Sequence, residues 1–407
     1  MKFLLIHQNF PAQFVHLAPG LAARGHEVVA LGISAGMPQL PGVKHVLHQP
    51  VAPQPGAVPK DPNWEEWTAK LARGHSCAVA MQELKAQGFT PDVVFAHPGW
   101  GEALYVKDVY PACRMLVYGE YYYGTEGGDS HFDPEFSRQA DLAASERLRI
   151  KNTHLLHALA VADGGVSPTE FQKSRHPAWF QPRLEVIHDG IDTDRFRPDS
   201  QASVGLQKAG LELKAGDEVV TFVARQLEPY RGYHVFMRAL PALLQARPNA
   251  RVVIVGGDGV SYGAAPPKGK TWKGIFLSEV QDSLDMQRVH FVGTVPHEVL
   301  RRLLQVSAVH VYLTYPFVLS WSLLEAMSMG CLIVGSRTAP LEEVVIDRQN
   351  GLLVDFFNPT ALAHTVASAL AERADLAHLR AAARETALRY DLRRNCLPKM
   401  IHYVESC

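Results

Sequence analysis

The sequence predicts an α/β protein made of two doubly wound, Rossmann-like domains. Short apolar segments of strand length alternate with helical segments from Lys2–Ile6 onward, and the same alternation restarts at Val219–Ala224. A polar stretch, residues 191–216, separates the two series and is expected to be a linker. Such alternation is typical of parallel sheets covered by helices on both faces, which bind ligands at the carboxyl ends of their strands. We therefore expect two such domains whose ligand-binding edges face a common cleft.

The first domain, residues 1–190, opens with a β-α-β unit. The strand Lys2–Ile6 is followed by apolar residues at helical spacing over Ala12–Arg24, and Gly25 ends that helix. A long helix is expected over about residues 64–87. The further strands are expected at His26–Leu31, Val43–Leu47, Asp92–Ala96, Arg114–Tyr118, Leu159–Val166 and Leu184–Ile187.

The second domain, residues 217–385, repeats this pattern. A helix is expected over Tyr233–Ala246, and Tyr262–Ser278 is expected to be a mobile surface insertion. Residues 386–407 end in an amphipathic helix that is expected to pack back on the first domain. The strands are expected at Val219–Ala224, Arg251–Val255, Val289–Val292, Ala308–Leu313, Leu332–Val334 and Leu352–Val354.

The composition is that of an ordinary globular enzyme or binding protein. In 407 residues, 40 Lys and Arg balance 41 Asp and Glu, so no global charge recruits nucleic acid or an anionic membrane. The apolar N-terminus is too short for a signal peptide, and no apolar run approaches the roughly 20 residues that cross a bilayer. The five cysteines are widely spread and form no C-x-x-C pair. We expect a cytoplasmic protein, with contact at the inner face of the membrane left open.

The stretch Thr314–Gly330 carries the first functional signal. It combines a polar loop with a helix start that Ser320 or Ser322 can cap, which leaves backbone N–H groups and the helix dipole ready for an anion such as phosphate. Glu325 follows about one turn later, in an apolar segment. Its carboxylate is expected to accept hydrogen bonds either from ligand hydroxyls or from neighbouring backbone.

Two arginines carry the second signal. Arg225 and Arg231 follow the strand Val219–Ala224, and Gly232 opens the next helix. Arginine supplies permanently charged, bidentate donors, which suit a diphosphate. The alternative is a pair of surface arginines, one of them paired with Glu228.

His97 and Glu120 are the candidate catalytic residues. Each follows a strand that is expected to end at the same edge of the first sheet. Either side chain could act as a base or only hydrogen-bond a ligand hydroxyl. The alternative is that His97 packs against Pro98 and Trp100 while Glu120 pairs with a basic residue. His154 and His157 share a helix face without a third ligand, so no metal site is expected.

Taken together, these motifs resemble the retaining, family 4-like glycosyltransferases of the GT-B fold (glycosyl transferases group 1). The turn Asp189-Gly-Ile-Asp192 resembles the turn that leads into the second domain of that family. The resemblance implies a nucleoside diphosphate sugar as donor, UDP- or GDP-linked, and no other cofactor. It assigns the diphosphate to Arg225 and Arg231 and the ribose to Glu325. It also assigns the base contact to the strand end around Thr294 and backbone N–H donors to Ser320, Trp321 and Ser322.

The chain departs from the family pattern at the expected sugar end of this site. The family's first glutamate falls at position 317, which is Phe317 here. Ser320 and Trp321 replace loop glycines, and Arg231 lies one residue further from Arg225 than the usual lysine does. The family's histidine in the first domain falls where this chain reads Gly119-Glu120-Tyr121.

The resulting hypothesis is sugar transfer, with retention, to an acceptor bound by the first domain. The acceptor could be a glycan, a lipid-linked sugar, a protein or a small molecule. The arginines and backbone N–H groups would stabilise the departing diphosphate, so no metal is required in principle. Two alternatives stay open: a binding or scaffolding protein that has lost catalysis, which Phe317 favours, and a sugar-nucleotide epimerase.

Overall fold

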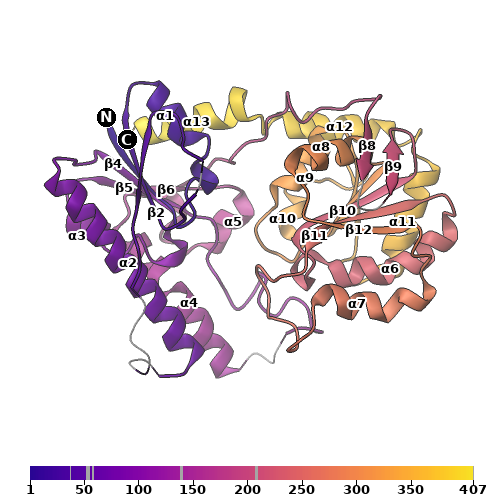
Figure 1. Ribbon diagram of the computed structural model, residues 1–407, viewed down its shortest axis with the longest axis horizontal. Coiled ribbons are helices and arrows are strands. Elements are labelled where there is room, and N and C mark those ends of the chain that lie inside the picture. The colour runs from indigo at the N-terminus through magenta and orange to yellow at the C-terminus, as the bar shows by residue number, and fades with distance from the viewer. Residues whose placement is uncertain (37, 52–55, 57–58, 138–140, 207–209, 407) are drawn as a thin grey trace. The chain divides into compact units, whose positions relative to one another are not determined.

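The chain forms two compact α/β units (Figure 1). The computed structural model describes residues 1–406 except 37, 52–55, 57–58, 138–140 and 207–209. One unit consists of Met1–Gly190 with Arg393–Cys407, and the other is Ile191–Leu392. Each unit contains a parallel sheet with helices on both faces, which confirms the predicted doubly wound fold class.

The first sheet has seven parallel strands in the order β3-β2-β1-β4-β5-β6-β7. The chain runs outward from β1 to one edge and then returns to the other side of β1, so the order reverses between β1 and β4. Polar residues that follow these two strands therefore lie at a topological switch point, where such sheets bind ligands. The strands are β1 (Lys2–Ile6), β2 (Glu27–Gly32), β3 (Val43–Leu47), β4 (Val93–Ala96), β5 (Arg114–Tyr118), β6 (Gly164–Ser167) and β7 (Leu184–Val186).

Two apolar cores cover the faces of this sheet. Helices α2, α3 and α4 contribute to one core, while α1 and the C-terminal helix α13 contribute to the other. Helix α13 also carries Glu405, which accepts hydrogen bonds from Arg24 and forms an ion pair with His26. The helices are α1 (Leu17–Ala23), α2 (Pro62–Ala86), α3 (Val106–Val109), α4 (Leu142–Val161), α5 (Glu170–Arg175) and α13 (Leu397–Glu405).

The second sheet has six parallel strands in the order β12-β11-β10-β13-β14-β15. Its order reverses between β10 and β13, which is the second switch point. A separate antiparallel pair, β8 and β9, packs with α8 against one side of this unit. The strands are β8 (Ser203–Leu206), β9 (Leu211–Lys214), β10 (Val219–Gln226), β11 (Arg251–Gly257), β12 (Val289–Gly293), β13 (Val309–Tyr312), β14 (Leu332–Ser336) and β15 (Leu352–Val354).

Helices cover both faces of the second sheet. Figure 1 shows α6 and α7 below the sheet and α8 and α12 above it; α11 packs against α6, and α9 packs against α12. Helix α6 packs on the sheet through stacked aromatic rings: the ring centroids of Phe222 on β10 and Phe236 on α6 lie 4.7 Å apart. The helices are α6 (Tyr233–Ala246), α7 (Trp272–Val280), α8 (His297–Val306), α9 (Trp321–Ser328), α10 (Ala339–Glu342), α11 (Pro359–Ala371) and α12 (Ala377–Leu388).

The structure differs from the predicted helix over Ala12–Arg24 and the predicted strand over Leu159–Val166. The former is a 3-10 turn, Ala12–Phe14, followed by α1 from Leu17. Pro19 explains the break, because an earlier helix start would require the N–H that proline lacks. Residues 159–161 belong instead to the end of α4. A short apolar run fits either a helix or a strand, so its periodicity did not decide between them.

Two stretches expected to be irregular contain regular structure. The expected linker, residues 191–216, includes β8 and β9, in which Val204 pairs with Leu213 and both are buried. The expected surface insertion Tyr262–Ser278 contains most of α7, which buries Phe276 and has Thr271 as its N-cap. Residues 207–209 of the linker lie outside the described residues.

Candidate functional site

The second unit has a pocket of about 430 Å³ where β10, β12 and β13 end. It lies at the switch point between β10 and β13, where a doubly wound sheet binds its ligand. Five of the residues predicted from the sequence line it together, although they are up to 97 residues apart in the chain. They are Arg225, Arg231, Thr294, Ser320 and Ser322.

A β-bulge directs Arg225 at this pocket. Val223 pairs with Val255 and Gln226 pairs with Gly257, so Ala224 and Arg225 together lie opposite one residue of β11. Bulges of this kind re-aim side chains and are common beside active sites. Arg225 is exposed, and it makes no hydrogen bond or ion pair with any residue that the structure describes. Its guanidinium is therefore available to an anion.

Arg231 is held inside the protein. It is 7% exposed and donates hydrogen bonds to Thr314 Oγ1 at 2.8 Å, the Val318 carbonyl at 3.1 Å and the Tyr312 hydroxyl at 3.3 Å. Gly232 follows at φ 65° and caps α6, and a side chain there would collide with Leu313. Arg231 therefore combines a positive charge at the pocket with a fixed position.

The start of α9 is the third component of the pocket. Ser320 caps the helix, as predicted, with its hydroxyl accepting from Ser322 N at 3.4 Å. Ser320 N itself donates to the Tyr312 hydroxyl at 2.9 Å. The Tyr312 oxygen thus joins Arg231 to the N-terminus of α9, and burial raises the pKa of Tyr312, so its hydroxyl stays protonated. The positive end of the helix dipole is held next to a buried arginine.

Glu228 organises the loop that covers this pocket rather than pairing with an arginine. It is fully buried and accepts backbone N–H bonds from Ser261, Tyr262 and Gly263 at 3.2 to 3.3 Å. Tyr262 lines the pocket, and Arg231 lies 5.3 Å from its ring centroid. The alternative of two surface arginines, one paired with Glu228, is wrong because Arg231 is buried and the Glu228 carboxylate binds a loop.

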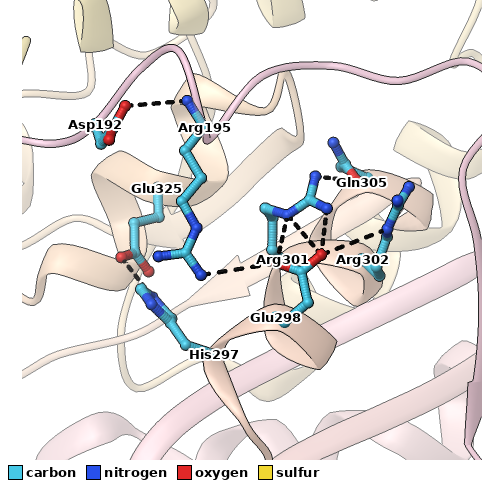
Figure 2. Close-up of polar contacts among 8 residues, drawn as sticks. All are labelled: Asp192, Arg195, His297, Glu298, Arg301, Arg302, Gln305 and Glu325. Atoms are coloured by element: carbon cyan, nitrogen blue, oxygen red, sulfur yellow. Dashed lines mark hydrogen bonds and ion pairs between the residues drawn. The ribbon is translucent and has the colours of Figure 1, made fainter.

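Glu325 pairs with His297. The Glu325 Oε1 lies 3.0 Å from His297 Nε2, and Figure 2 shows the two side chains meeting between α9 and the start of α8. This hydrogen bond is the main cause that raises the pKa of His297. Glu325 is 6% exposed, and the residues that line the pocket, as far as the chain is described, do not include it or the 40% exposed Trp321.

An ion-pair network continues from His297 along α8 (Figure 2). Glu298 accepts hydrogen bonds from Arg301 and lies 3.7 Å from Arg195 and 3.8 Å from Arg302. Arg195 is anchored by its backbone N–H to Asp192 at 3.1 Å. Glu298 and its arginine partners lie mostly at the surface, so these ion pairs contribute little to stability.

Phe317 packs in an aromatic cluster. Its ring centroid lies 5.5 Å from Tyr230 and 5.1 Å from Tyr262, and Tyr230 lies 4.8 Å from Tyr315. Phe317 is 4% exposed. The position at which the resembled family has a glutamate is therefore an apolar packing position next to Tyr262.

The first unit has its own pocket of about 380 Å³, where β4 and β5 end. His97 follows β4 and Glu120 follows β5, and both line it. His97 Nε2 lies 3.4 Å from Glu120 Oε2, and Gln13 donates to the other Glu120 oxygen at 3.0 Å. The structure thus brings the two candidate catalytic residues together in one pocket.

The surroundings of His97 fix its tautomer. Its Nδ1 accepts the backbone N–H of Gly99 at 3.1 Å, so a neutral ring carries its proton on Nε2. The ring is also stacked between Trp100 and Tyr118, at centroid distances of 4.6 and 5.5 Å. His97 therefore packs, as the alternative held, and its Nε2 lies near Glu120 without a hydrogen bond to it. This arrangement makes Glu120 the better proton acceptor.

Sequence reasoning missed several residues around both pockets. Tyr312 and His297 make the contacts just described. The local sequence indicates only that Tyr312 lies in a strand and that His297 begins a helix, so it does not mark either as a site residue. In the first pocket, Lys70, Lys151 and His154 line the wall, and burial lowers the pKa of His154 to about 3. They come from α2 and α4, whose packing the sequence pattern does not reveal.

Within the described residues, no helix is both long enough and apolar enough to span a membrane.

Two family profiles match most of the chain. The profile described as "Glycosyl transferase family 4 group" matches residues 24–196, and "Glycosyl transferases group 1" matches residues 206–386.

Curated relatives match parts of the chain. A D-inositol 3-phosphate glycosyltransferase of Mycobacterium sp. (strain JLS) is 30% identical over 189 residues, covering 46% of this chain and 39% of the relative. The protein of that name from Corynebacterium urealyticum is 28% identical over 253 residues, covering 61% and 54%. The chain thus spans about half or less of the length of these relatives.

Solved structures match the whole chain. Anabaena Alr3699/HepE in complex with UDP has a TM-score of 0.68 at 15% identity, with 100% of both chains covered. Sucrose-phosphate synthase from Thermosynechococcus elongatus has a TM-score of 0.73 at 18% identity, covering 100% of this chain and 98% of that one. The chain therefore has the GT-B fold and belongs to the glycosyl transferases of the family 4 group and group 1.

Proposed function

We propose that this protein is a retaining glycosyltransferase that moves a sugar from a nucleoside diphosphate donor to an acceptor hydroxyl. The observation that carries the proposal is the second-unit pocket, which joins an unpaired Arg225, a buried Arg231 and the capped start of α9. Two arginines and a helix N-terminus at one switch point form a site for a diphosphate. The family membership supports sugar as the group transferred.

The donor is proposed to lie with its diphosphate between the two arginines and α9. Thr294 and Val295 follow β12, line the pocket and would contact the base. Glu325 would accept hydrogen bonds from the ribose hydroxyls. Alr3699/HepE was solved with UDP and with UDP-glucose, which favours a UDP-sugar over a GDP-sugar here. Ribose binding requires Glu325 to share or leave its bond with His297.

In the reaction, the bond from the anomeric carbon to the outer diphosphate oxygen breaks, and a bond from that carbon to the acceptor oxygen forms. The electron pair leaves with the diphosphate. Arg225, Arg231 and the N–H groups of α9 would stabilise this charge, and preorganised donors of this kind usually contribute most to lowering the barrier. We propose that Glu120 accepts or orients the acceptor proton and that His97 donates from Nε2 to a hydroxyl. Retention is proposed from the family resemblance.

The product would enter a glycan, a glycolipid or a glycoprotein. We also propose that the protein acts in the cytoplasm. The four cysteines that the structure describes, Cys77, Cys113, Cys331 and Cys396, are unpaired, as a reducing compartment favours.

A nucleotide-release assay with a panel of UDP- and GDP-sugars and candidate acceptors tests the proposal. Release of one nucleoside diphosphate that depends on an acceptor is the expected result, and product analysis would show retained anomeric configuration. Conversion of the donor without an acceptor would indicate an epimerase instead. Failure of every nucleotide sugar to bind would contradict the proposal.

One observation favours a second candidate, a binding protein without catalysis. Phe317 occupies the position of the family's glutamate and is packed among tyrosines, so that carboxylate is missing. Such a protein would bind a nucleotide sugar in the second-unit pocket without turning it over. Tight donor binding with no turnover on any acceptor would favour this candidate.

A further inference from the structure

Three cations line the first-unit pocket behind His97 and Glu120. Lys70 and Arg73 lie three residues apart on α2 and share one helix face, and Lys151 comes from α4. Lys70 is 5% exposed, and its ammonium donates to Glu66 at 2.6 Å and to the Lys151 carbonyl at 3.3 Å. Lys70 is therefore paired within the protein.

The other two cations are not paired. Among the described residues, neither the Arg73 guanidinium nor the Lys151 ammonium makes an ion pair or a hydrogen bond. Lys151 instead lies over the ring of Tyr123, at 3.6 Å from its centroid. Lys151 is partly buried, and burial is the main cause that lowers its pKa, although the nearby Asp129 and Glu66 oppose this shift. Holding unpaired cations against a concave surface costs free energy that an anionic ligand would recover.

His154 gives an independent sign of a ligand in this pocket. It is 2% exposed and lies in the pocket wall, where its Nε2 bonds the Gly99 carbonyl at 2.8 Å. The Nε2 must donate to that carbonyl, so Nδ1 of the neutral ring is an acceptor, and it has no partner among the described residues. A buried acceptor without a partner is uncommon and suits a ligand hydroxyl.

We propose that this pocket takes an acceptor that carries both hydroxyls and an anionic group, that is, a sugar phosphate or a uronic acid. The anionic group would bind Arg73 and Lys151, a hydroxyl would donate to His154 Nδ1, and the reacting hydroxyl would lie at Glu120. Trp100 and Tyr123 supply the aromatic wall on which a sugar ring packs. The ligand's role as an acceptor rests on the proposed function, but the anion site itself does not depend on it.

The test is a calorimetric titration of the full chain with inorganic phosphate, compared among three proteins. These are the wild type, the double variant Arg73→Gln/Lys151→Gln and, as the matched control, Arg225→Gln in the second-unit pocket. The double variant should weaken phosphate binding to the first unit by about 10- to 100-fold, the loss expected for charge-assisted hydrogen bonds. The double variant should leave UDP binding unchanged. Arg225→Gln should instead weaken UDP binding and leave phosphate binding to the first unit unchanged.

Competition then identifies the anionic group. Glucose 6-phosphate or glucuronate should displace phosphate in the millimolar range or below, and glucose should not. Displacement by glucose 6-phosphate alone indicates a phosphate, and displacement by glucuronate alone indicates a carboxylate. If the double variant does not fold, the single variants Arg73→Gln and Lys151→Gln give the same comparison.

Unchanged phosphate binding in the double variant would overturn the inference, as would glucose competing as well as glucose 6-phosphate. A wild-type protein that binds phosphate through Arg73 and Lys151 but binds no UDP would contradict the proposed function and leave the anion site standing.

Discussion

His297 Nε2 and Glu325 Oε1 lie 3.0 Å apart and form a hydrogen-bonded pair at the start of α8. Glu325 is the carboxylate that the family resemblance assigns to the donor ribose, so under the proposed function the pair would link donor binding to the protonation of His297. Neutral His297 can also donate from Nε2, but the charged form binds the carboxylate more strongly.

The pair predicts a raised pKa for His297. Because its folded-state pKa lies above the ordinary 6.5, the pair stabilises the fold below about pH 6.5 and loses that contribution as pH rises through the folded pKa. Glu325→Gln should return the His297 pKa toward its ordinary value, which an NMR titration of the imidazole measures. An unchanged pKa in Glu325→Gln would show that the pair does not form in solution.

Glu102 predicts a second pH effect in the first unit. Its side chain is fully buried, neither carboxylate oxygen has a partner among the described residues beyond its own backbone N–H, and burial raises its pKa to about 7. In the unfolded chain the Glu102 carboxyl ionises near pH 4.5, while in the folded protein it stays protonated up to about pH 7. The free energy of unfolding therefore falls between about pH 4.5 and 7. Glu102→Gln removes this loss.

Relative to the wild type, the free energy of unfolding of Glu102→Gln should increase by about 3 kcal/mol between about pH 4.5 and pH 8. Urea denaturation of both proteins at about pH 5 and pH 8 measures most of it. The constant effect of replacing a carboxyl by an amide cancels between the two pH values. A difference that does not change with pH would contradict a raised Glu102 pKa.

Alanine substitution of the two arginines in the second-unit pocket should have different effects on the stability of the fold. Arg231→Ala removes three hydrogen bonds and leaves buried partners, so it should destabilise the fold by about 2 to 4 kcal/mol and weaken donor binding. Arg225→Ala should change stability by less than about 0.5 kcal/mol, because its side chain is exposed and unpaired. Denaturant melts of both variants check this, and equal losses would contradict the structure.

Glu228 should act on the pocket through its loop. Glu228→Gln weakens the three backbone N–H bonds from Ser261, Tyr262 and Gly263 and should cost about 2 kcal/mol. It should also weaken donor binding, because Tyr262 lines the pocket. Glu279→Gln on α7, which removes a half-exposed ion pair with Arg238 of α6, is the control and should cost less than about 1 kcal/mol. Equal donor affinity in both variants would show that the loop plays no part.

Much of the fold could be predicted because its signals are local. Strand-length apolar runs such as Lys2–Ile6 and Arg114–Tyr118, and the helix Tyr233–Ala246, have the predicted bounds. The end of α4 and the hairpin of β8 and β9 were missed. Short apolar runs fit either a helix or a strand, and the buried side chains of the hairpin lie within a largely polar stretch.

The pocket-lining residues that could be predicted follow strand ends or begin a helix. Arg225, His97 and Glu120 were expected at a pocket because parallel strands bring their carboxyl ends to one edge, and Ser320 and Ser322 because they can cap a helix. Tyr312, His297 and Lys151 were missed because their contacts depend on helix packing and on side-chain direction. The same reason explains Glu325, whose partner lies 28 residues away at the start of α8.

The central claim is that the second-unit pocket binds a nucleoside diphosphate sugar through Arg225. Isothermal titration of UDP and UDP-glucose into the wild type and Arg225→Ala, with a thermal melt of each, tests it most directly. We expect binding to the wild type, at least about tenfold weaker binding to the variant, and melting temperatures that agree in the absence of ligand. Equal affinity of both proteins for UDP, or no binding of any nucleoside diphosphate to the wild type, would contradict the claim.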